Sequence, residues 1–574
     1  MLNSFNRAKF LLDFFPIFTW LKTYTRQDAT DDVFAGVITA ILLVPQGIAY
    51  AVLAGLPPQL GLYASILPPV VYALLGTSRA LSVGPVSIAA IMIAGVLAEP
   101  EIQMLNQPVA SALLLSALSG VIMLLMALLR LGGLVNFISH PVLAGFTSGA
   151  AILIILSQLP AMAGLPAPQC GFNLMCYADY ASTANPYSLF IAAMALAVLV
   201  IFTKPLPWLL KKLQVKTAWV TAISKGGPLL TVVISAVLAQ YFSQAQHTVA
   251  VVGKIPAGLP EFQLNFLNWP LAHMLLPYAT FIALIAYIES VAIAKVTANL
   301  RGQKIVPNQE LIALGLANLA AATTGGMPVA GGFSRTMVNY SAGAKTQMAM
   351  LIAAGCLALS VIFFSTWFQA IPKAALAAII LIAVYRLVRI RHIVHTWNYD
   401  KADGLAEAAT LLGVLILGIE EGIGFGIVLT IASQLRKASH PHIAIVGRVP
   451  DTEHYRNIKR HSVETWHHLL LVRIDESITF ANISYIEEFL EAELRRQPNT
   501  KHVILIFTSV SDIDTTALEA LEMFNDTLRL TGRTLNIAEA KGPVLDKLSK
   551  TDFVEQLKPG KVYFRTEEAV RALG

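Results

Sequence analysis

Long apolar runs separated by short polar loops dominate the chain between about residue 33 and residue 435. Clear examples are residues 109–129, 188–202, 348–364 and 405–419. A helix needs roughly 20 mostly apolar residues to cross a bilayer. The pattern therefore predicts an α-helical polytopic membrane domain with roughly twelve to fourteen spans.

Basic residues are concentrated in alternate loops between these runs. Lys and Arg crowd the loops around residues 204–216 and 386–401, whereas residues 100–108 and 159–186 contain neither. By the positive-inside rule the basic loops and both termini are cytoplasmic. Termini on the same side require an even number of spans, and fourteen fits the alternation best.

Composition agrees with a membrane protein. The 574 residues are 56% hydrophobic and only 13% charged, whereas soluble domains carry roughly a quarter charged residues. The net charge of +6 follows from the basic loops and requires no nucleic-acid partner. Residues 6–26 mix basic and aromatic side chains, which predicts an amphipathic helix on the membrane surface rather than a cleavable signal peptide.

The pattern changes near Arg436, and charged residues become frequent after His440. Short β-branched and leucine-rich runs at 469–474, 503–507 and 534–537 predict strands. Residues 485–496 have helical spacing, and Asp514 precedes a segment that begins like an N-capped helix. We therefore expect an interfacial segment at 1–31, a transmembrane domain at 32–436 and a cytoplasmic α/β domain at 437–574.

The sequence Gly-Gly-Phe-Ser-Arg at 331–335 places a cation inside an apolar region. An arginine there is costly, so by default it marks an ion path or a substrate site. The glycines break the span, and a helix that restarts at Ser334 directs free N–H groups and a positive dipole end into the gap. Broken helices hold anions in this way in transporters. The alternative is a re-entrant loop in which Arg335 only pairs with a carboxylate.

Two further segments combine polar residues with helix breakers. In 44–50 (VPQGIAY), Gln46 and Tyr50 fit a kinked span that faces a cavity, although a tolerated kink with the amide bonded to a neighbouring helix is also possible. In 82–87 (SVGPVS), the broken segment is a plausible counterpart of the break at Ser334 in an inverted repeat.

Glu289 lies within the apolar run 275–294. Its carboxylate either pairs permanently with a cation such as Arg335, or titrates and carries a proton with the substrate. A cation ligand is the third possibility.

Several classes of chemistry have no support in the sequence. No Walker motif, G-x-S-x-G elbow or HExxH is present, so neither ATP-driven transport nor an enzyme is indicated. The histidines have no convincing metal-ligand partners, and we expect no metal or cofactor. Cys170 and Cys176 share an outer loop, where a disulfide and two thiols are both possible. Energy must then come from a gradient of an ion or of the substrate.

With these residues assembled, the chain resembles the sulfate permease (SulP) family, which is related to the animal solute carrier 26 anion transporters. The resemblance runs from about residue 30 to the C-terminus. It rests on VPQGIAYAVLAGLPPQLGLYAS (44–65), GTSRALSVGPVSIAA (76–90), PNQELIALGLANL (307–319), GGFSRTMVN (331–339) and, in the tail, IDTTAL (513–518), which resembles a STAS domain.

This resemblance implies fourteen spans in two inverted repeats of seven, divided into a core and a gate, with a homodimeric assembly. It implies that the anion lies between half-helices beginning near Val86 and Ser334. The implied pocket residues are Gln46, Tyr50, Pro85, Val86, Ser87, Ser334 and Arg335.

The resemblance also assigns a coupling role to Glu289. Family members of the bicarbonate type have a sodium-binding Asp with a nearby hydroxyl in this region. Here Glu289 is followed one turn later by Ile293, which favours proton over sodium coupling. We therefore expect proton-coupled sulfate uptake, with a bicarbonate or dicarboxylate transporter or anion exchanger as the alternative.

The STAS resemblance suggests a second kind of function. In related bacterial domains a hydroxyl at a helix N-terminus is phosphorylated, and Thr516 occupies that position; the alternative is a simple helix cap. A membrane-anchored sensor or scaffold acting through this domain is the alternative of another class. We expect a multi-pass protein of a bacterial inner membrane.

Overall fold

The computed structural model describes residues 15–574 except 137–138, 166–183, 204, 215–219, 221–222, 225, 246–247, 254–257 and 265. The chain forms two compact units, which divide between Ile427 and Val428. This division falls inside the helix α22 (Ile419–Ser439), which also contains the predicted domain boundary at 436/437. We propose that the two domains meet at the predicted boundary, 436/437, near the end of this helix.

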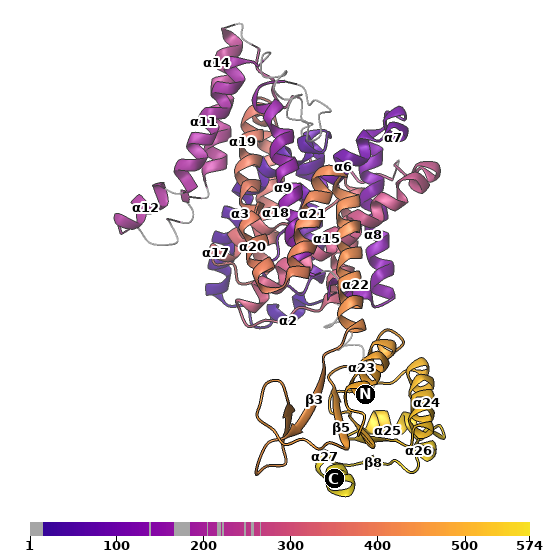
Figure 1. Ribbon diagram of the computed structural model, residues 1–574. Coiled ribbons are helices and arrows are strands. Elements are labelled where there is room, and N and C mark those ends of the chain that lie inside the picture. Colours follow the sequence, from indigo (N-terminus) through magenta and orange to yellow (C-terminus); the bar gives the residue numbers. More distant parts are fainter. Residues whose placement is uncertain are drawn as a thin grey trace, which may run out of the picture. The chain divides into compact units, whose positions relative to one another are not determined.

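The first unit is built of helices (Figure 1). Eight helices of the described residues are long and apolar enough to cross a membrane. In chain order the elements are α2 (Ile17–Leu21), α3 (Arg26–Leu53), α4 (Pro58–Tyr63), α5 (Leu67–Leu75), β1 (Val83–Gly84), α6 (Ser87–Ala98), α7 (Pro100–Met104), α8 (Pro108–Leu128), η1 (Leu131–Asn136), α9 (His140–Met162), α11 (Pro186–Thr203), α12 (Pro205–Lys212), α14 (Gly227–Gln244), α15 (Trp269–Asn299), α16 (Pro307–Thr323), β2 (Ala330–Gly331), α17 (Phe333–Ser341), α18 (Met348–Phe368), α19 (Lys373–Val384), η2 (Tyr385–Leu387), α20 (Ile390–Tyr399) and α21 (Lys401–Ile416).

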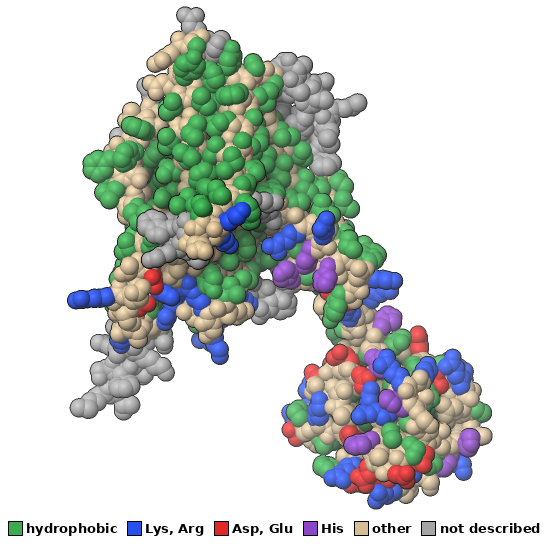
Figure 2. All heavy atoms as spheres, turned by 90° about the vertical axis from the view of Figure 1, so that its left-hand side faces the viewer, with side chains coloured by type: hydrophobic (Ala, Val, Ile, Leu, Met, Phe, Trp, Pro, Cys, Tyr) green, Lys and Arg blue, Asp and Glu red, His purple; other side chains and the backbone are tan. Residues whose placement is uncertain are grey.

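The surface of this unit is suited to lipid. Hydrophobic side chains cover most of the face seen in Figure 2, and Lys and Arg gather at its lower edge. Large apolar side chains such as Leu125 and Phe363 are 53% and 71% exposed. A contiguous apolar surface of this kind is rare on soluble monomers, so it indicates a face that contacts the bilayer.

The N-terminal segment differs from the predicted single amphipathic helix over 6–26. Of its described part, only Ile17–Leu21 forms a helix. A new helix, α3, begins at Arg26, because Thr25 and Asp28 form a reciprocal capping box there. Residues 1–14 lie outside the described residues, as do Cys170 and Cys176; Cys356 in α18 is a free thiol.

The second unit is an α/β domain with a six-stranded sheet in the order β4-β3-β5-β6-β7-β8. The strand β3 is antiparallel to β4 and to β5, and the other pairs are parallel. The predicted strands and helices are confirmed within a few residues. The elements are β3 (Ile443–Arg448), β4 (Tyr455–Asn457), β5 (Leu469–Ile474), α23 (Ile483–Arg496), β6 (His502–Ile506), α24 (Thr515–Leu530), β7 (Thr534–Ala538), α25 (Gly542–Leu548), α26 (Phe553–Gln556), β8 (Val562–Tyr563) and α27 (Thr566–Leu573).

Candidate functional site

Two short helices of the membrane unit begin side by side. The strands β1 and β2 pair antiparallel, with Val83 opposite Gly331 and Gly84 opposite Ala330. The helices α6 and α17 follow these strands after two residues and one residue, starting at Ser87 and Phe333. The predicted restarts near Val86 and Ser334 are confirmed within one residue. Both N-termini, with their free N–H groups and positive dipole ends, therefore lie in the same region.

Buried polar side chains hold the two segments together. The Ser82 N–H donates to Thr336 Oγ1 (3.0 Å), and the Gly332 N–H donates to the Ser82 carbonyl (3.0 Å). The Asn339 amide donates to the Ala80 carbonyl (3.1 Å). From α15, the Ser290 hydroxyl accepts from the Gly331 N–H (2.7 Å). Sequence reasoning missed this network, because hydroxyls and amides in apolar runs do not by themselves indicate their distant partners.

Arg335 is buried beside these helix starts. Its side chain is 2% exposed, and Nε, Nη1 and Nη2 all lack a hydrogen-bond partner. The guanidinium lies against glycines: a Cβ on Gly84 would be 3.3 Å from both Nη atoms, and one on Gly332 would be 2.9 Å from Nη2. A buried cation without a partner costs several kcal/mol. The predicted role of Arg335 in anion binding stays a prediction, and this unpartnered burial is the observation that favours it.

Glu289 comes from α15 and lines the same cavity as Arg335. Its Oε2 atom is buried and has no hydrogen-bond partner. Because no nitrogen of Arg335 is bonded either, the two side chains do not form the permanent pair that the sequence left open. A carboxylate near a cation but not bonded to it can change its charge without breaking a structural contact.

All residues predicted for the pocket meet around one cavity of about 300 Å³. Gln46 and Tyr50 are 5% and 7% exposed and come from α3, with Gln46 Oε1 unpartnered. The same cavity is lined by Pro85, Val86, Ser87, Glu289, Ser334 and Arg335. Their role in binding stays a prediction, but the structure brings them together.

The cavity also contains Arg389, which sequence reasoning assigned only to a basic loop. The Arg389 N–H donates to Ser148 Oγ (3.1 Å), and this hydroxyl also donates to the Leu387 carbonyl (3.3 Å). The backbone after η2 is thereby tied to α9. No signal in the sequence separates Arg389 from its basic neighbours, because only the fold turns it toward the cavity.

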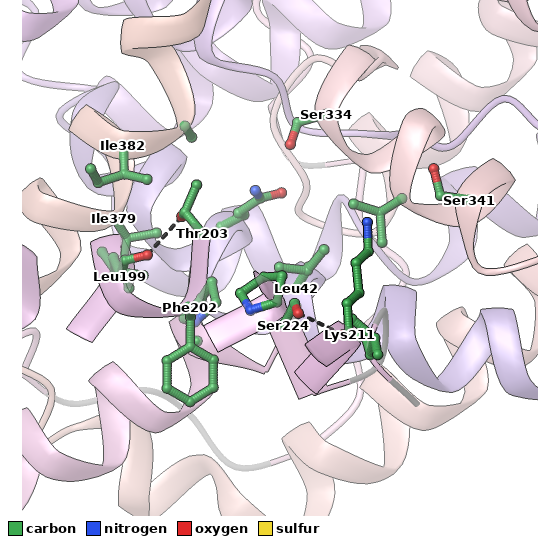
Figure 3. A pocket seen from close by; sticks show the side chains of 17 residues that line it. Leu42, Leu199, Phe202, Thr203, Lys211, Ser224, Ser334, Ser341, Ile379 and Ile382 are labelled. Carbon is green, nitrogen blue, oxygen red and sulfur yellow. Dashed lines mark hydrogen bonds between the residues drawn. The ribbon is translucent and has the colours of Figure 1, made fainter. Parts of the chain in front are cut away.

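A second cavity of about 340 Å³ adjoins the first and shares Gln46, Ser334 and Ala383 with it. Figure 3 shows its apolar wall of Leu199, Ile379 and Ile382, and the Lys211 side chain reaching into it. Its hydroxyl groups come from Thr203, Ser224, Ser334 and Ser341. The shared residues place this second, mainly apolar cavity next to the one that contains Arg335.

In the second unit, Asp514 caps α24 as predicted, because its Oδ1 accepts from the Ala517 N–H (2.8 Å). The other oxygen accepts from the Phe480 N–H (2.7 Å). Thr516 is exposed as the second residue of this helix. Among the described residues, no group of three or more His, Cys, Asp or Glu is placed to hold a metal ion.

Comparison with known proteins identifies the family. The model of the sulfate permease family matches residues 30–410, and that of the STAS domain matches residues 460–569. The chain belongs to the sulfate permease family. It is thus a secondary anion transporter with several membrane spans and an α/β STAS domain. It is not an enzyme.

Relatives and solved structures agree with this assignment. The permease is 34% identical to the probable sulfate transporter 4.2 of Arabidopsis thaliana, over 97% of this chain and 83% of that protein. It is 30% identical to the low affinity sulfate transporter 3 of Stylosanthes hamata, over 98% of this chain and 91% of that protein.

Two solved structures share the fold. The structure of SLC26A9 matches with a TM-score of 0.89 at 20% identity, over 100% of this chain and 94% of that chain. The transmembrane domain of the cyanobacterial bicarbonate transporter BicA matches with a TM-score of 0.59 at 21% identity, over 71% of this chain and 98% of that chain. At these identities the likeness concerns the fold alone.

Proposed function

We propose that this permease takes up sulfate together with protons. The observation that supports this most is the buried, unpartnered Arg335 beside the first turns of α6 and α17. A small oxyanion would meet the guanidinium, the free N–H groups of both helices and the hydroxyls of Ser87 and Ser334. These donors would replace the water that the anion loses, and charge-assisted hydrogen bonds of this kind are about twice as strong as neutral ones.

The proposed proton carrier is Glu289. When ionised, its carboxylate competes with the substrate for Arg335 and repels a second negative charge in the same cavity. Protonation removes this repulsion, so a proton and the anion would bind together and move together. This coupling distinguishes the proposal from simple facilitated diffusion.

Sulfate is proposed because the relatives described above are named as sulfate transporters. The alternative is a bicarbonate or dicarboxylate transporter or exchanger, because the cavity offers charge and size recognition with few specific groups. Competition by bicarbonate, succinate and chloride against labelled sulfate would rank these substrates. A sensor or scaffold function of the STAS domain would be favoured only if the purified protein bound a cytosolic partner without transporting anions.

The arrangement in the membrane is part of the proposal. The basic loops and Lys211 would face the cytoplasm, so the second cavity would be the inner exit. Both termini and the STAS domain would then be cytoplasmic, and the permease would act as a homodimer in a bacterial inner membrane. Thr516 is accessible for phosphorylation, but Asp514 two residues earlier would repel a phosphate.

Arg335→Met tests the proposal. We expect this variant in liposomes to lose concentrative sulfate uptake, while its melting temperature without anion is unchanged or higher, because an unpaired buried charge is removed. Arg391→Met, which removes a cation outside the cavity lining, is the matched control and should transport normally. Normal uptake by Arg335→Met would refute the proposal.

A further inference from the structure

A separate cavity of about 330 Å³ lies among the loops that join the helices of the membrane unit. Three basic side chains line it, each from a different connection: Arg79 between α5 and β1, Arg301 after α15, and Lys345 between α17 and α18. Trp20 and Tyr24, in and just after α2, complete its wall. This cavity shares no lining residue with the site around Arg335.

Among the described contacts, Arg301 is held by neutral groups, and Lys345 has only one long ion pair. The Arg301 guanidinium donates through Nη2 to the Ala344 carbonyl and lies 4.7 Å from the centre of the Tyr340 ring. Lys345 Nζ is 4.0 Å from Asp31, at the limit of an ion pair. The one carboxylate in the lining, Asp28, accepts from the N–H and hydroxyl of Thr25 (2.9 and 2.8 Å).

Asp32 lies beneath this lining and is fully buried. Its oxygens accept from the Lys345 N–H (2.6 Å), the Thr346 hydroxyl (2.6 Å) and the Tyr24 hydroxyl (3.1 Å). These donors are all neutral groups. The carboxylate thus anchors the loop that carries Lys345, and it forms no ion pair with the basic side chains of the lining.

A second, independent observation indicates a missing acceptor. Trp20 is only 2% exposed, and its Nε1–H has no hydrogen-bond partner. Buried indole N–H groups normally find an acceptor. Trp20 lines the cavity, so a ligand bound there that carries several oxygen atoms is a candidate acceptor for this N–H.

We propose that this cavity binds the phosphate headgroup of an anionic lipid. Phe18 and Leu21, next to Trp20 on α2, are 46% and 45% exposed, which suits a segment lying at the membrane–water interface. Trp and Tyr favour this level of the bilayer, and basic pockets between helices on the cytoplasmic side bind lipid headgroups. The bound lipid would join α2 and α3 to the loops before β1 and after α17, and so brace the helices that carry the substrate site.

The test is the thermal unfolding of the full chain in neutral detergent, with and without phosphatidylglycerol. We expect phosphatidylglycerol to raise the melting temperature by about 3–6 °C at saturation, and phosphatidylcholine or inorganic phosphate to have little effect. The double variant Arg79→Gln/Lys345→Gln should lose this rise. The matched control Lys304→Gln, in the loop of Arg301 but outside the lining, should retain it, and so should Arg335→Met.

The variant Trp20→Phe distinguishes specific binding in the cavity from general attraction of the lipid to basic side chains. It keeps the ring and removes only the N–H donor, so we expect the lipid-dependent rise to fall to about half that of the wild type. A full rise in Trp20→Phe would overturn the proposal, because attraction by charge alone would then explain it. A full rise in the double variant would also overturn it, because the lipid would then act at another place. A rise produced equally by inorganic phosphate would also overturn it, because the ligand would then be a soluble anion.

Discussion

At the scale of single residues, the position of Arg335 depends on two glycines. A Cβ on Gly332 would lie 2.9 Å from Nη2 and 3.1 Å from Nε of Arg335, which is too close for the guanidinium to remain where it is. Gly332 itself has φ −91° and ψ 123°, which any residue adopts. Its lack of a side chain is thus needed for space and not for backbone conformation.

Gly332→Ala should consequently weaken sulfate binding while leaving the fold intact. The flexible guanidinium would shift rather than the backbone, and displacing a positioned group by about 1 Å typically costs roughly ten- to a hundredfold. The measurement is the apparent affinity for sulfate in the uptake assay. Gly95→Ala in α6, where an added Cβ meets nothing within 4 Å, is the control, and equal affinities in the two variants would contradict this role for Gly332.

Glu289 determines the expected pH dependence. Wild-type uptake should rise as the external pH falls, because the carboxyl group must be protonated for the anion to bind. Glu289→Gln imitates the protonated form, so this variant should still exchange sulfate but should no longer respond to a proton gradient. Glu101→Gln, an exposed control, should behave as the wild type. An unchanged pH response in Glu289→Gln would exclude Glu289 as the carrier.

At the scale of elements, a buried carboxylate joins α5 and the loop after it to α16. Glu310 is fully buried in the first turn of α16. It accepts from the Tyr72 hydroxyl (2.6 Å), from the N–H and hydroxyl of Thr77 (2.7 and 2.5 Å) and from the Ser78 N–H (3.2 Å). These donors satisfy the Glu310 carboxylate, whereas the Arg335 guanidinium has no hydrogen-bond partner. Glu310 is therefore a structural residue.

Glu310→Gln should destabilise the permease without changing its affinity for sulfate. The amide removes the charge and leaves the Tyr72 hydroxyl without its carboxylate acceptor, at a cost of roughly 1–3 kcal/mol. Differential scanning fluorimetry should show a lower melting temperature, whereas Glu99→Gln, an exposed control, should show none of this loss. A variant as stable as the wild type would contradict the structural role.

The sequence could predict those features that depend only on residues close together in the chain. Apolar runs, the cap at Asp514 and the glycine and proline breaks at 84–85 and 331–332 depend on local chemistry, and each is found in the structure. Contacts between residues far apart in the sequence carry no such local signal. The bonds from Ser290 to Gly331 and from Glu310 to Thr77 are visible only once the helices are packed, and the same holds for Arg389 in the cavity.

At the scale of the whole molecule, each unit has a hydrophobic core of its own. The core of the membrane unit contains many small side chains such as Ala49, Ala90 and Ala317 among its leucines, isoleucines and valines, and these let helices approach closely in lipid. The second unit has two clusters, both with leucine, isoleucine and valine, and the larger one also contains phenylalanine. The change in composition near residue 436 reflects two different surroundings, lipid for the first unit and water for the second. For this reason the sequence alone indicated two domains.

The proposed oxyanion site lies at one place in the molecule, between the starts of two helices. The most direct measurement is the anomalous signal of selenate, which has the shape and charge of sulfate, bound to the purified permease. We expect one selenium peak within hydrogen-bonding reach of Arg335 and the first N–H groups of α6 and α17. A peak elsewhere, with Arg335 bonded to Glu289 instead, would contradict it.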